Sequence, residues 1–184
     1  MFYGMRLDEE QAAFRDAIWS RKHDIIFCSG RAGTGKSTIA ILTAMLMYNY
    51  GLIDGIHYII NPTQESVLGY LPGDNSQKIA PYMSALWSAI ETADYVPEKV
   101  IRGCNIESEK AGEAFITAES STFLRGSNIG ANSKKIVIID EAQNFTVQDL
   151  RKTLTRVCDG SIVIVVGQEI QCDLKDKKSS GFIP

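Results

Sequence analysis

Short apolar runs alternate along the chain with longer stretches that suit helices. The runs that predict strands cover residues 24–28, 57–60, 114–118, 135–139 and 161–166. The stretches that predict helices cover about 8–21, 36–50, 76–93 and 147–157. Strands that alternate with helices in this way are typical of a mostly parallel sheet with helices on both faces. The pattern therefore predicts an α/β fold, in which residues 94–113 form an irregular polar segment.

A glycine-rich stretch follows the apolar run at 25–28, which is expected to form a buried strand. Residues 30–37 read GRAGTGKS and match every fixed position of the phosphate-binding loop, G-x-x-x-x-G-K-S/T. Such a loop, placed before a helix N-terminus, holds phosphates through backbone N–H groups and the helix dipole. Lys36 is expected to reach the β- and γ-phosphates, and the Ser37 hydroxyl to bind Mg²⁺. The predicted nucleotide-binding residues of this loop are Gly30, Arg31, Ala32, Gly33, Thr34, Gly35, Lys36, Ser37 and Thr38.

Two acidic residues stand at the end of the apolar run at 136–139. In open α/β sheets ligands bind at the carboxyl ends of the strands, so Asp140 and Glu141 are expected beside the phosphate loop. Asp140 is predicted to hold Mg²⁺, and Glu141 to orient and deprotonate an attacking water. The segment at 167–171, which reads GQEIQ, also ends an apolar strand and could bring an amide close to the γ-phosphate. The alternative interpretations are an acidic helix cap and a simple turn.

Length and composition indicate a single domain over residues 1–184. The net charge of −3 argues against a generally basic nucleic-acid binder. The four cysteines are far apart and form no C-x-x-C pair, which disfavours a zinc site and a disulfide framework. No apolar run reaches the ~20 residues that span a bilayer, and the N-terminus is unlike a signal peptide. A cytoplasmic protein with no membrane partner is therefore expected.

Together these residues resemble the PhoH-like ATPase family, which is related to the first RecA-like domain of superfamily-one helicases. The resemblance covers about residues 7–182. It is carried by GRAGTGKS, LGYLPGDNSQKIAPYMSAL at 68–86, FLRG at 123–126, IIDEAQNFTVQDLRKTLTR at 138–156 and the tail QCDLKDKKSSGF. The segment at 68–86 carries most of the assignment, because it is not general to phosphate-loop proteins. The resemblance implies a RecA-like P-loop NTPase fold, with ATP and Mg²⁺ as cofactors and ATP hydrolysis as the activity.

The resemblance also assigns roles to individual glutamines. Gln11 is similar to the glutamine that reads adenine in such helicases, because its amide can pair with the adenine edge. Its spacing from Asp8 also fits a capping box, and both interpretations stay open. Gln171 matches the sensor glutamine of the family and is a candidate catalytic residue, whereas Gln168 stands where the family has Asp.

Hydrolysis also needs positive charge near the γ-phosphate in the transition state. Arg125 in the FLRG segment and Arg156 after the DEAQ helix are the candidates, acting in cis or on a neighbouring subunit. For either one, an ordinary surface arginine is the alternative. The resemblance suggests a homo-oligomeric ring, with six subunits by family likeness, and single-stranded RNA or DNA as a partner. Basic residues that could contact such a strand are Lys134, Lys135, Arg151, Lys152, Lys175, Lys177 and Lys178.

Two other functions stay open. A nucleoside kinase of the thymidine-kinase type shares a phosphate loop and an Asp-Glu-Ala-Gln-Phe-like run. In this chain, however, Asn144 separates Gln143 from Phe145, and the paired zinc cysteines of that family are missing. A non-catalytic binding module ordered by nucleotide is favoured by Gln168 and by a C-terminal end that comes earlier than the family pattern.

Overall fold

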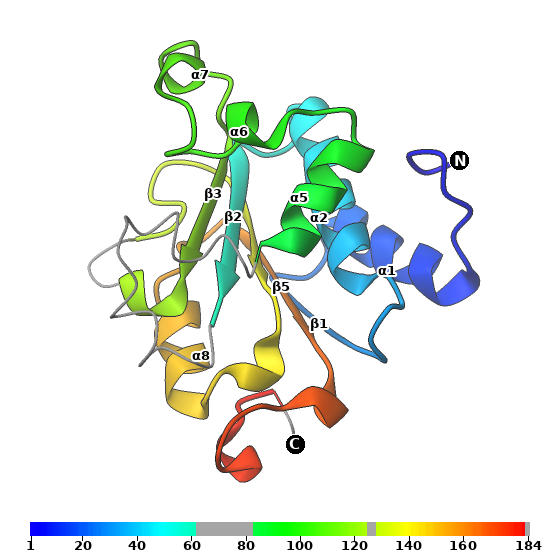
Figure 1. Ribbon diagram of the computed structural model, residues 1–184, viewed down its shortest axis with the longest axis vertical. Helices are drawn as coiled ribbons and strands as arrows, with labels where there is room; N and C mark the ends of the chain where they lie inside the picture. Colours follow the sequence, from blue (N-terminus) through cyan, green and yellow to red (C-terminus); the bar gives the residue numbers. More distant parts are fainter. Residues whose placement is uncertain (62–82, 125–127, 183–184) are drawn as a thin grey trace.

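The chain folds around one parallel β-sheet (Figure 1). The computed structural model describes residues 1–61, 83–124 and 128–182. The strands are β1 (Ile25–Ser29), β2 (Gly55–Ile60), β3 (Ile116–Ser120), β4 (Lys135–Ile139) and β5 (Ile162–Gly167). They lie in the order β1-β5-β4-β2-β3, and every pairing between neighbours is parallel. The predicted α/β class with a parallel sheet is confirmed.

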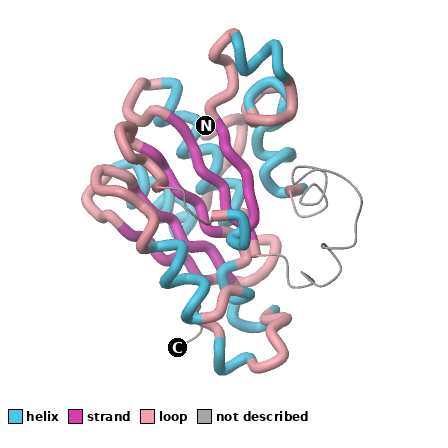
Figure 2. The backbone as a smooth tube through the Cα atoms, turned by 90° about the vertical axis from the view of Figure 1, so that its left-hand side faces the viewer, coloured by secondary structure: helices cyan, strands magenta, loops and turns pink. Residues whose placement is uncertain are grey.

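Helices accompany the sheet on both sides, and Figure 2 shows the strands running side by side through the molecule. Three of them pack together on one face, namely α1 (Glu9–Ser20), α2 (Lys36–Asn49) and α5 (Ser84–Thr92). On the other face lies α8 (Val147–Leu154). Shorter helical segments are α6 (Pro97–Val100), α7 (Ile106–Lys110), η2 (Ser121–Phe123), η3 (Ala142–Asn144), η4 (Glu169–Gln171) and η5 (Lys177–Ser179).

Alternate residues of the central strands pack into two different cores. Ile136 and Ile138 of β4 belong to the cluster that contains Met45 of α2. Val137 and Ile139, which lie between them in the chain, belong to the cluster that contains Leu150 of α8. Because successive side chains of a strand point to opposite faces, β4 is buried on both sides of the sheet. This double burial explains why its sequence is a continuous apolar run instead of an alternating one.

The strand before the phosphate loop differs from the prediction, because it is not buried. Ile25 is 46% exposed and Phe27 is 56% exposed. Within the described residues, β1 pairs only with β5 and forms an edge of the sheet. Its apolar run predicted the strand correctly, but a run of four residues cannot distinguish a central strand from an edge strand.

The remaining differences concern element boundaries. β3 begins two residues later than the predicted run at 114–118, and α8 ends at Leu154, three residues before the predicted end. The segment at 94–113, predicted as irregular, contains the two short helices α6 and α7. The start of the helix predicted at 76–93 lies outside the described residues, which contain its second half as α5.

Candidate nucleotide-binding site

Many of the predicted site residues meet at the carboxyl ends of the parallel strands. The phosphate loop follows β1, Asp140 follows β4 and Gln168 follows β5, so parallel strands carry all three to the same edge. They surround a pocket of about 200 Å³. Its lining consists of Ala32, Gly33, Gly35, Lys36, Ser37, Thr38, Ala85, Asp140, Glu141, Val166, Gly167, Gln168 and Gln171. The sequence analysis had assigned no role to Ala85 of α5.

The phosphate loop is shaped by glycines and held by its own lysine. Gly33 and Gly35 have φ values of +76° and +78°, a left-handed conformation that glycine adopts without strain. The ammonium of Lys36 donates to the carbonyl oxygens of Gly30 and Arg31, each at 2.8 Å. These two carbonyls occupy donors that would otherwise be available to phosphate oxygens. Lys36 is therefore already placed over the loop.

Asp140 is buried and accepts three hydrogen bonds. Its Oδ1 accepts from the Ser37 hydroxyl at 2.9 Å and from the backbone N–H of Glu141 at 2.9 Å. Its Oδ2 accepts from the Tyr58 hydroxyl at 2.6 Å. Burial and, after it, the charge of Asp140 raise the pKa of Tyr58 well above its ordinary value, so the phenol stays protonated and donates. The sequence analysis missed Tyr58, because a tyrosine in an apolar strand has the pattern of a core residue.

Ser37 and Asp140 suit a hard cation such as Mg²⁺. A hydroxyl and a carboxylate within hydrogen-bond distance supply oxygen ligands, and Mg²⁺ prefers one or two such protein ligands together with water and phosphates. The described residues contain no cluster of three or more His, Cys, Asp or Glu side chains that could hold a metal alone. The pair thus fits a metal that arrives with the nucleotide.

Glu141 adopts an uncommon backbone conformation at the rim of the pocket. Its φ of 51° and ψ of 41° lie in the left-handed region, which is unfavourable for a side chain with a Cβ and is concentrated at functional sites. The Glu141 side chain is exposed, and its Oε2 accepts from the amide of Gln143 at 2.5 Å. The candidate base is therefore near the pocket, but its carboxylate is held by a protein donor.

Gln143 connects the segment after β4 with the segment after β5. Its side chain is fully buried, and its Oε1 accepts from the Gln168 backbone N–H at 2.9 Å. Its amide also donates to the carbonyl oxygen of Gln171 at 3.3 Å. Gln171, predicted as a sensor, lines the pocket from η4, so the structure brings it near Glu141.

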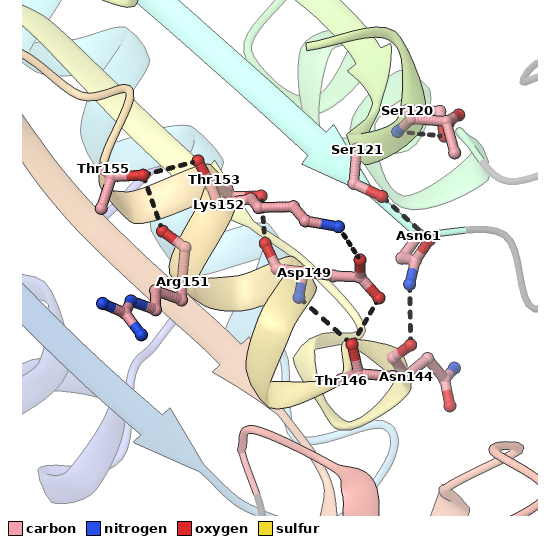
Figure 3. Close-up of polar contacts among 11 residues, drawn as sticks. Asn61, Ser120, Ser121, Asn144, Thr146, Asp149, Arg151, Lys152, Thr153 and Thr155 are labelled. Carbon is pink, nitrogen blue, oxygen red and sulfur yellow. Dashed lines mark hydrogen bonds and ion pairs between the residues drawn. The ribbon is translucent and has the colours of Figure 1, made fainter. Parts of the chain in front are cut away.

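A second set of polar contacts ties the neighbouring strand ends together (Figure 3). The Asn61 amide donates to the Asn144 carbonyl at 2.8 Å, and its Oδ1 accepts from the Ser121 hydroxyl at 2.9 Å. Asn61 follows β2 and Ser121 follows β3, so one side chain bridges three strand ends. The Asn61 side chain thus serves as a structural crosslink between these strand ends.

Gln11 makes the capping contacts that were one of its two interpretations. Its backbone N–H donates to Asp8 at 2.8 Å, and its own Oε1 accepts from the Asp8 backbone at 3.1 Å. The same side chain donates through Nε2 to the carbonyl oxygen of Thr34 at 3.1 Å. Gln11 therefore links the first helix to the phosphate loop, and its reading of adenine stays a prediction.

Among the described residues, no predicted arginine lines the pocket. Arg156, beyond the end of α8, and Arg31 do not belong to the lining, and Arg125 lies outside the described residues. The predicted basic residues fall into separate groups. Lys134 and Lys135 lie at the amino end of β4, whereas those at 175–178 follow the carboxyl end of β5.

Comparison with known proteins assigns the family. A family described as PhoH-like protein matches residues 6–184. The chain belongs to the PhoH-like family. It is 33% identical over 167 residues to a PhoH-like protein of Synechocystis sp., and 30% identical over 177 residues to the protein PhoH of Escherichia coli. These matches cover 88% and 95% of this chain, but only 46% and 47% of the relatives.

The chain thus spans about half the length of the curated relatives it matches. A PhoH-like protein of Bacillus subtilis, 32% identical over 167 residues, gives the same picture with 48% of its length covered. Family membership and the phosphate loop together support a nucleotide-binding protein of the P-loop NTPase type. In the described part of the chain, no helix has the length and apolarity that crossing a membrane requires.

Proposed function

We propose that this chain binds ATP with Mg²⁺ and hydrolyses the γ-phosphate. The observation that carries the proposal is the common pocket of Lys36, Ser37, Asp140 and Glu141, which come from two segments that lie far apart in the chain. A loop that only bound a structural phosphate would need no acidic pair at the end of another strand of the sheet.

Each of these residues has a distinct task in the proposed reaction. The loop backbone and Lys36 bind the phosphates, and Ser37 with Asp140 would hold the Mg²⁺, which supplies positive charge against the phosphate oxygens. Glu141 takes a proton from the attacking water. The Gln143 amide donates to Oε2 of Glu141 and so orients the carboxylate, whose other oxygen would take the proton. Gln171 lies beside this group, where its side chain can respond to the γ-phosphate.

Steady-state phosphate release from ATP tests the proposal, measured alone and with single-stranded RNA or thymidine. Lys36→Ala should abolish binding of Mg·ATP, whereas Glu141→Gln should bind ATP and lose turnover, because only the base is removed. Glu107→Gln on the exposed face of α7 is the matched control and should behave like the parent. Parental turnover by Glu141→Gln would contradict the assignment of the base. Consumption of ATP only with thymidine would indicate a nucleoside kinase, and binding without turnover a non-catalytic module.

We further propose that neighbouring subunits complete the site in a homo-oligomeric ring around single-stranded RNA or DNA. Among the described residues, Lys36 is the one cation that lines the pocket, whereas transfer of the γ-phosphate needs further positive charge. Arg125 or Arg156 of a neighbour would supply it. Basic loops facing a central pore would bind the nucleic acid mainly through its phosphates.

Mixing two inactive variants tests this ring. Lys36→Ala and an Arg125→Ala, Arg156→Ala double variant should regain activity when mixed, wherever an intact pocket meets an intact arginine. A protein that stays monomeric with ATP, yet turns over normally, would contradict the ring and leave a mechanism within one subunit.

A further inference from the structure

We infer that Tyr58 is a positioning residue that fixes the carboxylate of Asp140 for the divalent cation. This inference rests on the proposed function and assigns a role to a residue outside the phosphate loop and the acidic pair. Tyr58 lies in the middle of β2, and its partner in the neighbouring strand is Ile138, two residues before Asp140. Because β2 and β4 are neighbours in the sheet, the Tyr58 hydroxyl reaches the Asp140 carboxylate at the carboxyl end of β4.

The two carboxylate oxygens of Asp140 contact different side chains. Oδ2 points to Tyr58, whose hydroxyl donates at 2.6 Å. Oδ1 points to Ser37, the other proposed ligand, at 2.9 Å. Because the Tyr58 hydroxyl holds Oδ2, Oδ1 is the carboxylate oxygen that lies on the side of Ser37. The Tyr58 hydroxyl thereby selects which oxygen faces the cation.

The burial of both partners makes this contact specific. Tyr58 is 1% exposed and Asp140 is 4% exposed, so water cannot easily replace the phenol. The Tyr58 ring packs in the core that contains residues of α2, and this packing limits where its hydroxyl can go. Without the hydroxyl, the buried Oδ2 would lose the donor that Tyr58 supplies, and the carboxylate would rotate away from its position beside Ser37. This change lowers affinity for the cation, as the loss of outer partners of metal ligands generally does.

Tyr58→Phe tests the inference, because it removes the hydroxyl and keeps the ring. The measurement is the binding of a fluorescent ATP analogue, first in EDTA and then titrated with MgCl₂. Binding in EDTA reports the folded, nucleotide-competent fraction, so it separates misfolding from a metal effect. We expect EDTA binding within about twofold of the parent, and a half-saturating Mg²⁺ concentration raised about tenfold. Tyr95→Phe is the matched control, since its hydroxyl donates to Asn49 at 2.8 Å on the surface, and it should leave both quantities unchanged.

A double-mutant cycle with Asp140→Asn adds a readout that a purely structural tyrosine would not move. If Tyr58 acts through the carboxylate, Tyr58→Phe should no longer change the half-saturating Mg²⁺ concentration in the Asp140→Asn background. A Tyr58→Phe protein with parental Mg²⁺ dependence would overturn the inference and leave the proposed function intact. A parental protein whose nucleotide binding ignores Mg²⁺ would overturn the proposed function, and the inference with it.

Discussion

Gln143→Ala should both destabilise the fold and slow hydrolysis, because it removes the hydrogen bonds of one buried side chain that also orients Glu141. The fully buried Gln143 side chain makes hydrogen bonds to Glu141, to the Gln168 backbone and to the Gln171 backbone. Three bonds at about 1 kcal/mol each amount to about 3 kcal/mol of lost unfolding free energy. For a chain of 184 residues, this corresponds to a melting temperature lower by roughly 6–12 °C.

Urea denaturation followed by circular dichroism measures this loss, and Gln148→Ala is the matched control. Gln148 is an exposed glutamine of α8, so its truncation should change the unfolding free energy by less than about 0.5 kcal/mol. Phosphate release should fall in Gln143→Ala, because Glu141 loses its orienting donor, whereas ATP binding should persist, since Gln143 does not line the pocket. If the unfolding free energy of Gln143→Ala fell by less than about 1 kcal/mol, the three hydrogen bonds would not stabilise the fold as expected.

Three further predictions concern packing and base choice. Phe145→Ala should lower the unfolding free energy by about 3–5 kcal/mol, and Phe27→Ala by clearly less, because Phe145 is fully buried and Phe27 is 56% exposed; equal losses in urea would contradict the edge position of β1. Gly130→Ala should lower the melting temperature more than Gly160→Ala. Both glycines have positive φ, but of the two only Gly130 has close neighbours that an added Cβ would meet, namely the Ser161 hydroxyl and the Ser133 carbonyl oxygen. Gln11→Ala should erase a preference for ATP over GTP in competition binding; a variant that loses stability but keeps the preference would support the capping role alone.

The order of elements in the chain could be predicted because each depends on local information. The glycine-rich loop and the apolar run before Asp140 are complete patterns within ten residues, and the structure has a strand, loop and helix at the first and a buried strand at the second. Their meeting at one pocket follows from a general rule for parallel sheets, so the sequence also predicted that Lys36, Ser37 and Asp140 are neighbours.

Exposure of β1 could not be predicted in the same way, because it depends on what lies beside the strand. Ile25 and Phe27 have the composition of core residues, and a central position for β1 would have buried them. The strand order instead leaves β1 at the edge of the described sheet, with Phe27 beside the groove formed by α8 residues such as Leu150. Neighbours in a sheet are set by contacts between distant segments, which no run of four residues contains.

The same limit explains why the sequence identified Asp140 and missed the side chain that holds it. Tyr58 precedes Asp140 by 82 positions and sits among isoleucines, where an aromatic residue normally fills a core. Only the adjacency of β2 and β4, with Tyr58 opposite Ile138, turns its hydroxyl toward the carboxylate. Once the strand order is known, a polar side chain in an apolar strand therefore indicates a contact with the site when the neighbouring strand carries site residues. In this chain that reasoning singles out a tyrosine whose hydroxyl costs free energy to bury unless it is paired, and whose pairing partner is the proposed metal ligand.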